Sequence, residues 1–152
     1  MSRRHPRKTH HAIESGGDIL TDVMGYLGFH HVQLAMPQGR EREAAAFYCD
    51  VLGFEQIPKP TQLAGRGGCW FRSGPVELHL GVEEPYIPAR RAHPALLVSD
   101  LERLRATLEN AGVQPILDTQ LDRHGRLYAT DPFGNRLEFI AATRSHGDEP
   151  EA

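Results

Sequence analysis

The sequence predicts an α+β fold built from two βαβββ modules, because the same order of strands and helix occurs twice along the chain. A second observation supports the repeat, since each module opens on a histidine and closes on a strand that carries a glutamate. The predicted organisation is a polar leader at 1–24, a single domain at 25–142 with modules at 28–81 and 93–141 joined by a linker at 82–92, and a polar tail at 143–152.

Composition places the chain among ordinary globular proteins. Its 152 residues, 39% hydrophobic and 24% charged, are enough to bury a core. The net charge of -3 provides no field that favours nucleic acids or anionic membranes, and no apolar run reaches the ~18 residues of a membrane-spanning helix. Cys49 and Cys69 lack the spacing of a zinc or redox motif, so we expect free thiols in a protein of the reducing cytoplasm.

In the first module, a helix is predicted at 40–52, and strands at 29–35, 54–57, 69–72 and 76–81. The helix ends at Gly53, a residue suited to the left-handed conformation that follows many helices. Its apolar face, at helical spacing, consists of Ala44, Phe47, Tyr48 and Val51. A glycine-rich loop is expected between the second and third strands.

In the second module, strands are predicted at 93–98, 113–117, 125–130 and 136–140. Ser99 with Glu102 three residues later forms a capping-box pattern, which predicts that the helix starts at Ser99. The helix should end at Gly112, and its buried stripe should consist of Leu101, Leu104, Leu108 and Ala111. We expect Asp131 and Asn135 to shape the turn before the last strand through local hydrogen bonds.

Each module pairs a histidine with a glutamate at nearly the same separation. Glu77 follows His31 by 46 residues, and Glu138 follows His93 by 45. Polar side chains within apolar strands are costly to bury unless something binds them. A divalent cation removes this cost, because imidazole nitrogens and carboxylate oxygens are ordinary metal ligands. If the modules pack as pseudo-symmetric partners, all four residues could line one cleft and bind Zn, Ni, Mn, Co or Fe(II).

His79 is an alternative ligand to Glu77, because it lies two residues further along the same strand and therefore on the same face. The repeated spacing favours Glu77 as the ligand. Gln33 shares the face of His31 and could orient a ligand or contact substrate. His30 points to the opposite face and is expected at the surface.

Three further residues lie on strands that would border such a cleft: Trp70, Arg126 and Tyr128. Arg126 could bind a substrate carboxylate or phosphate. The alternative interpretation of the three is an exposed arginine, a strand tyrosine and a core tryptophan. The remaining histidines of interest have simpler explanations, since His10 and His11 belong to the polar leader and His124 to a predicted loop.

Three sequence motifs resemble those of the vicinal oxygen chelate superfamily, the glyoxalase, bleomycin-resistance and extradiol-dioxygenase group. GFHHVQL at 28–34 resembles the opening strand of these proteins, AFYCDVLGF at 46–54 resembles their helix end, and DPFGNRLE at 131–138 resembles their closing turn and strand. The motifs occur in the expected order, so the resemblance extends over residues 28–140, nearly the whole chain without its tails.

This resemblance implies two βαβββ modules whose mixed sheets curve into an open cup, usually in a homodimer that can share cleft walls between subunits. It also implies a metal held by the first and last strands of each module, at His31, Glu77 or His79, His93 and Glu138. A metal with open positions would bind two neighbouring oxygens of a small-molecule substrate and act as a Lewis acid. Glu77 or Glu138 could leave the metal and act as the base.

The resemblance favours a metal-dependent enzyme with lyase or isomerase chemistry, and a glyoxalase-type reaction would add a thiol cosubstrate. One alternative is a non-catalytic ligand-binding protein of the bleomycin-resistance type, although members of that type lack the metal ligands. The other is an extradiol dioxygenase, although many of these carry two pairs of modules.

Overall fold

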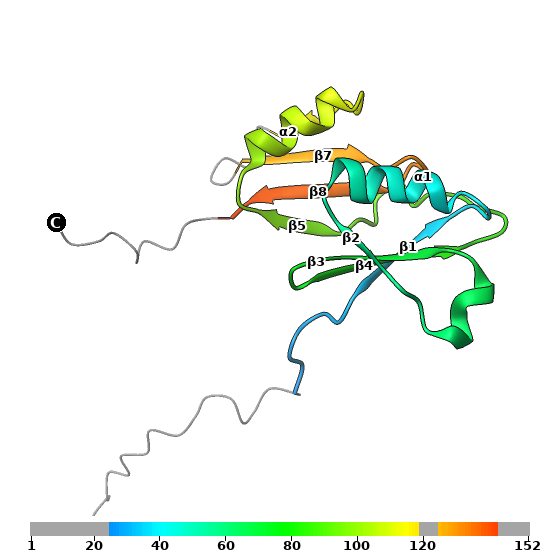
Figure 1. The fold of residues 1–152 in the computed structure, drawn as a ribbon. Helices are drawn as coiled ribbons and strands as arrows, with labels where there is room; N and C mark the ends of the chain where they lie inside the picture. Colours follow the sequence, from blue (N-terminus) through cyan, green and yellow to red (C-terminus); the bar gives the residue numbers. More distant parts are fainter. Residues whose placement is uncertain (1–24, 119–124, 143–152) are drawn as a thin grey trace, which may run out of the picture.

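The computed structural model describes residues 25–118 and 125–142 and contains two βαβββ modules, as predicted (Figure 1). The first consists of β1 (Val32–Met36), α1 (Glu41–Ala45), the π-helical segment η1 (Ala46–Val51), β2 (Glu55–Ile57), the 3-10 helix η2 (Thr61–Arg66), β3 (Cys69–Ser73) and β4 (Val76–Val82). The second consists of β5 (Ala95–Val98), α2 (Leu101–Asn110), β6 (Ile116–Leu117), β7 (Arg126–Thr130) and β8 (Arg136–Ala141). The predicted leader, tail and His124 lie outside the described residues.

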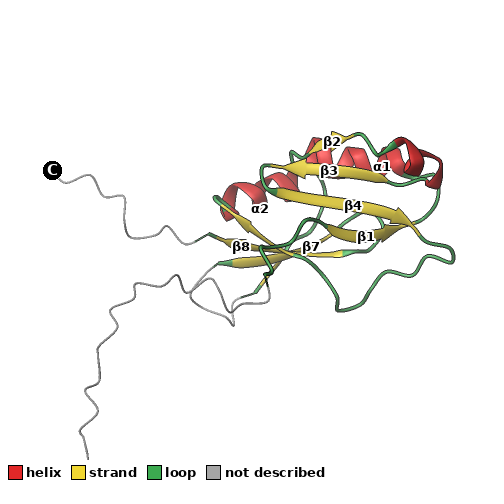
Figure 2. Ribbon diagram, turned by 90° about the horizontal axis from the view of Figure 1, so that it is seen from below, coloured by secondary structure: helices red, strands yellow, loops and turns green. Residues whose placement is uncertain are grey.

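Each module folds into its own four-stranded sheet with the same topology. The first sheet has the order β1-β4-β3-β2 and the second β5-β8-β7-β6. In both, the first and last strands are parallel neighbours and the other pairs are antiparallel. The two sheets remain separate and do not close into a barrel (Figure 2). The strands that carry the predicted ligands therefore lie side by side within each module.

Alternation along the strands separates a core face from a polar face in each sheet. The core face of the first sheet includes Cys69, Phe71, Leu78 and Leu80, and that of the second includes Leu127, Ala129, Leu137 and Phe139. The helices add Ala44, Phe47, Tyr48, Leu101 and Leu108, so that one hydrophobic core joins both modules. In the described part of the chain, no helix has the length and hydropathy needed to cross a membrane.

The turn between β7 and β8 forms hydrogen bonds that link the second module to the first. Oδ1 of Asp131 accepts hydrogen bonds from the backbone N–H groups of Phe133 and Asn135, at 2.9 and 2.8 Å. Oδ2 accepts from the Tyr48 hydroxyl at 2.9 Å and from the Asn135 amide at 2.8 Å. The same amide also donates to the Ala35 carbonyl on β1 at 2.8 Å. The turn-shaping role predicted for Asp131 and Asn135 is confirmed, and the network also links the two modules.

Two details of the second helix differ from the sequence prediction. Asp100, not Ser99, is the N-cap residue, because the Asp100 side chain accepts a hydrogen bond from the backbone N–H of Arg103 at 2.9 Å. The capping box predicted for Ser99 and Glu102 is therefore wrong by one residue. Ala111 lies beyond the end of the helix and is exposed rather than buried.

The glycine-rich segment after β2 is more ordered than a loop. Residues Thr61–Arg66 form a 3-10 helix, and the chain then passes close to β4. A Cβ atom at Gly68 would lie 2.1 Å from the Leu80 carbonyl oxygen, and Gly68 has a φ of +77°. Its N–H donates to Oε1 of Glu41 at 2.9 Å. Only glycine fits this approach, which brings the start of β3 against its neighbour.

Both cysteines are free, as predicted. Cys69 is buried in the core, and burial raises the pKa of its thiol to about 12. Burial also raises the pKa of Cys49. Thiolate chemistry at neutral pH is therefore disfavoured at both positions, and we place neither in a reaction.

Candidate functional site

The predicted ligands lie on the polar faces of the two sheets, in one cluster per module. In the first sheet, His79 lies directly across from Gln33 on β1 and from Trp70 on β3. In the second sheet, Glu138 lies across from Ala95 on β5 and from Tyr128 on β7. His31 immediately precedes β1, and His93 lies two residues before β5.

The strand register corrects the expectation that Glu77 matches Glu138. The partner of His79 is Gln33, two residues after His31, and the partner of Glu138 is Ala95, two residues after His93. His79 is therefore the positional counterpart of Glu138. Spacing along the chain was misleading, because His79 follows His31 by 48 residues whereas Glu138 follows His93 by 45.

The first cluster is a stack of three rings. The centroids of the Trp70 and His79 rings lie 3.8 Å apart, and the rings are 2° from parallel. The His31 ring stacks on the His79 ring, with centroids 4.0 Å apart and an interplanar angle of 18°. His79 is only 3% exposed, whereas His31 is at the surface. His30 is exposed, as predicted, but the expectation that it points away from His31 is wrong, because its Nδ1 lies 2.9 Å from Nδ1 of His31. Trp70 therefore contributes to the polar cluster and is not a core residue.

Glu77 holds His79 from one side. Its Oε1 lies 2.8 Å from His79 Nε2, and its Oε2 pairs with the Arg72 guanidinium at 2.8 Å. Hydrogen bonds from Arg72 and then from His79 lower the pKa of Glu77 to about 2, so it is ionised at neutral pH. Burial lowers the pKa of His79, and the bond to Glu77 opposes this only in part. A neutral His79 then carries its proton on Nε2 and leaves Nδ1 with a free lone pair.

The second cluster is centred on Glu138, which is 6% exposed. His93 Nε2 lies 2.9 Å from Glu138 Oε2, and an Arg126 nitrogen lies 2.6 Å from Oε1. The Tyr128 hydroxyl is 3.4 Å from the same Oε1. Arg126 is thus engaged with the protein's own carboxylate. This position differs from the free substrate-binding arginine that the sequence suggested.

The arrangement of nitrogen and oxygen atoms around His93 is compatible with a bound cation. His93 Nδ1 lies 2.5 Å from the Arg91 carbonyl oxygen, which can only accept a hydrogen bond, so Nδ1 carries a proton. In the neutral ring, Nε2 then has a lone pair that faces a carboxylate oxygen. Two such acceptors are stable together if Nε2 gains a second proton or if a cation lies between them. Metal-bound histidines commonly donate their other N–H to a carbonyl in this way.

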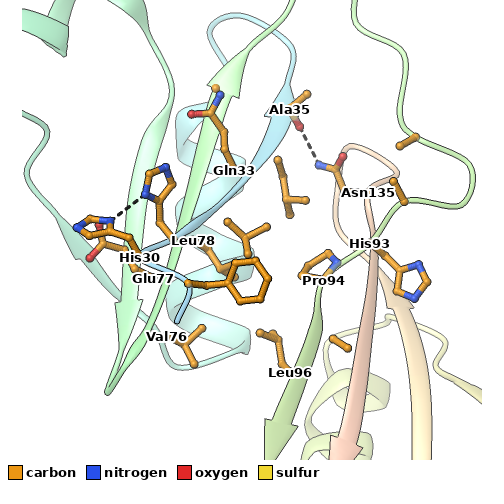
Figure 3. Close-up of a pocket in the computed structure, with 18 of the residues that line it drawn as sticks. His30, Gln33, Ala35, Val76, Glu77, Leu78, His93, Pro94, Leu96 and Asn135 are labelled. Carbon is orange, nitrogen blue, oxygen red and sulfur yellow. Dashed lines mark hydrogen bonds between the residues drawn. The ribbon is translucent and has the colours of Figure 1, made fainter. Parts of the chain in front are cut away.

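A cavity of about 870 Å³ separates the two clusters within the chain (Figure 3). Gln33 and Glu77 lie on its first-module wall, whereas the His93 ring lies on the opposite wall and points away from them. The side chains between them include Val76, Leu78, Pro94 and Leu96. Among residues 25–118 and 125–142, no three His, Cys, Asp or Glu side chains are grouped closely enough to hold a metal ion. Within the described part of a single copy, the predicted ligands therefore lie in two separate clusters and not in one four-residue group.

Sequence reasoning missed two arginines that belong to these clusters. Arg72 lies across from Glu77 on β3, and Arg136 lies two residues before Glu138 on β8. Strand alternation places Arg136 on the face of Glu138, so period-two spacing could have identified it. The same spacing places Arg72 on the face of Trp70 on β3, although its pairing with Glu77 depends on the register of two strands.

Comparison with known proteins identifies the family. A sequence profile of the Glyoxalase/Bleomycin resistance protein/Dioxygenase superfamily matches residues 28–139. A solved structure of a glyoxalase family protein from Bacillus anthracis is 46% identical with a TM-score of 0.75, and the match covers 78% of this chain and 97% of that one. The chain therefore belongs to this superfamily.

More distant structures are similar in fold. The fosfomycin resistance protein FosX from Listeria monocytogenes is 14% identical with a TM-score of 0.61, over 76% of this chain and 93% of that one. Lactoylglutathione lyase from Agrobacterium tumefaciens is 19% identical with a TM-score of 0.55, over 73% of this chain and 92% of that one. No match was found among curated proteins.

Proposed function

We propose that this protein is a metal-dependent enzyme that binds neighbouring oxygens of a small-molecule substrate, with lyase or isomerase chemistry. The observation that carries the proposal is the arrangement of His93, whose Nδ1 faces a carbonyl oxygen while its Nε2 faces Glu138 Oε2 at 2.9 Å. Neighbouring ligand atoms on one small cation are separated by roughly 3 Å, since each lies about 2.0–2.2 Å from the metal. The spacing of this pair suits two ligands of Zn, Ni, Mn, Co or Fe(II).

We propose that the remaining ligands come from the first module of a second copy in a homodimer. Within one chain the first-module wall of the cavity and His93 are on opposite sides. The segment before β1 exposes Tyr26, Leu27 and Phe29 to solvent at 81%, 102% and 93%. Leu97 on the second sheet is also exposed, at 71%. A contact with a second copy would cover these exposed apolar side chains.

In this arrangement His93 and Glu138 of one copy would meet His31 and His79 of the other. The strand register supports His79 over Glu77 as the fourth ligand. Glu77 then acts as a positioning residue, since its hydrogen bond keeps the proton on His79 Nε2 and the lone pair on Nδ1. Arg72 keeps Glu77 ionised and in place.

The metal, when bound, would supply Lewis-acid stabilisation of negative charge on a substrate oxygen. Glu138 is placed to accept a proton beside that oxygen, because its Oε1 is held by Arg126 while Oε2 faces the ligand position. Tyr128 adds a hydroxyl beside the same carboxylate.

Both cysteine thiols, Cys49 and Cys69, are free, which suits a protein of the reducing cytoplasm.

Metal analysis tests this proposal. Protein prepared without an affinity tag or chelator should contain about one equivalent of a transition metal per chain, because a preformed ligand set binds the metal tightly. His93→Ala and Glu138→Ala should each lose it, whereas Glu102→Gln, an exposed residue of α2, should retain it. Absence of metal from the wild type after reconstitution would contradict the proposal. It would favour a cup that sequesters a ligand without chemistry.

A further inference from the structure

A second, smaller pocket lies on the polar face of the second sheet, beside the His93–Glu138 pair. Its volume is about 400 Å³. Arg136, Arg90, Gln114 and Thr130 supply its polar lining, and Tyr128 and Ile116 supply aromatic and aliphatic surface. Ile116 and Tyr128 are direct cross-strand neighbours, as are Thr130 and Arg136. The pocket therefore rests on regular strands of the sheet.

Arg136 is the distinctive residue of this pocket. Its guanidinium carbon lies 3.9 Å from the centre of the Tyr128 ring, so the charged group covers the ring. The side chain is half-buried, yet it forms no ion pair with any carboxylate among the described residues. The neighbouring Arg126 differs, because Glu138 neutralises it at 2.6 Å. The guanidinium of Arg136 is therefore stabilised by the Tyr128 ring and remains available to pair with an anion.

The geometry of a stacked guanidinium leaves its N–H groups available at its edge. These donors match the two oxygens of a carboxylate or phosphate in a bidentate arrangement. Arg90 adds a second positive charge at the rim, where it is exposed. Gln114 and Thr130 add neutral hydrogen-bonding groups. The lining therefore combines two cations, no carboxylate and an apolar wall.

We propose that this pocket binds the carboxylate or phosphate group of a small organic anion, with Arg136 as its main receptor and Arg90 as an auxiliary charge. Tyr128 connects the pocket to the ligand pair, since its hydroxyl is 3.4 Å from Glu138 Oε1 and its ring contacts the His93 ring at 5.7 Å. An anion held by Arg136 would thus place the rest of its molecule beside Glu138. The assignment of this anion as the substrate rests on the proposed function; the binding itself does not.

Binding is best measured by titrating the metal-free full chain with benzoate, phenyl phosphate and the neutral analogue benzamide, followed by calorimetry and by the NMR signals of Tyr128. Benzoate or phenyl phosphate should bind saturably, and benzamide should not. Arg136→Met should weaken the preferred anion about tenfold or more, because hydrogen bonds to charged groups are among the stronger ones. Arg103→Met, an exposed charge on α2, should leave the affinity unchanged.

The two anions distinguish a carboxylate receptor from a phosphate receptor. Arg136→Lys keeps the charge but loses the planar donor fork, so it should restore only part of the affinity and guards against misfolding of the methionine variant. Equal binding of benzamide, no saturable anion binding, or unchanged affinity in Arg136→Met would overturn the inference. Anion binding without metal binding would contradict the proposed function alone, and metal binding without an Arg136 effect would contradict this inference alone.

Discussion

In the first module the position across from Gln33 is taken by His79, whereas the matching position in the second module, across from Ala95, is taken by Glu138. The aromatic neighbours also correspond, since Trp70 lies beside the histidine and Tyr128 beside the glutamate. The same backbone position therefore carries a nitrogen base in one sheet and a carboxylate in the other.

The neighbouring cross-strand pair on the same face of each sheet differs in charge between the two modules. In the first sheet Glu77 lies across from Arg72, and the two form an ion pair. In the second sheet the corresponding residues are Arg136 and Thr130, and the arginine is left without a carboxylate among the described residues. The repeated fold thus supplies equivalent positions with complementary chemistry. We infer that the first module would provide two histidine ligands, whereas the second would provide a histidine, a carboxylate and an anion receptor.

The largest expected effect is a loss of stability when the turn between β7 and β8 is altered, compared with a variant beside the turn between β3 and β4. Asp131→Ala should lower the free energy of unfolding by about 3 kcal/mol, because it leaves several buried donors without an acceptor. Ser73→Ala, at the exposed end of β3 beside the turn to β4, should change it by less than about 0.5 kcal/mol. Urea denaturation of both variants measures the difference. Similar stability of the two variants would show that the network around Asp131 does not fasten the modules together.

A second prediction tests whether His79 or Glu77 corresponds to Glu138. His79→Ala should abolish metal binding at micromolar metal, since it removes a ligand. Glu77→Gln should weaken binding by about 10- to 100-fold, the range typical of residues that orient a ligand. Competition with a chromogenic chelator gives both affinities, with Glu102→Gln as the matched control. A larger loss in Glu77→Gln than in His79→Ala would reverse the assignment drawn from the strand register.

A smaller effect concerns the pH dependence of stability in the metal-free protein. Burial lowers the pKa of His79 in the folded state, whereas in the unfolded chain the ring becomes protonated at about pH 6.5. The contribution of His79 is therefore fully present above that pH and is lost as the pH falls. Glu77, with a pKa of about 2, stays ionised throughout this window.

Urea denaturation of the metal-free protein at pH 7.5 and 5.5 measures this effect. The wild type should lose more stability on acidification than His79→Gln, which has no titrating ring at this position. An identical loss in both proteins would mean that other histidines dominate the acid sensitivity and that the first cluster tolerates a charged His79.

The sequence predicted the repeat of modules, the order of strands and the two faces of each sheet, because all of these depend on local periodicity. It also identified Glu138 and His93, which the structure brings within 2.9 Å. The match between His79 and Glu138 could not be predicted in the same way. The first module is three residues longer over this span, and only strand pairing shows how the extra residues are accommodated.

Other features depended on packing between distant segments. The sequence placed Arg126 beside the cleft but could not show that Glu138 already pairs with it. It also could not show that the two clusters lie on opposite walls of a cavity, because that follows from how the sheets dock. Ser99 and Asp100 are both acceptable N-cap residues, so a one-residue error at that helix start reflects competition between neighbours.

In the proposed homodimer, one metal site combines the second module of one copy with the first module of another. The direct measurement is to co-refold His93→Ala/Glu138→Ala protein with His31→Ala/His79→Ala protein and to measure bound metal. Each variant alone should bind none. The mixed dimers should regain metal, because each contains one intact pair of modules contributed by the two chains. No recovery in verified mixed dimers would contradict the shared site.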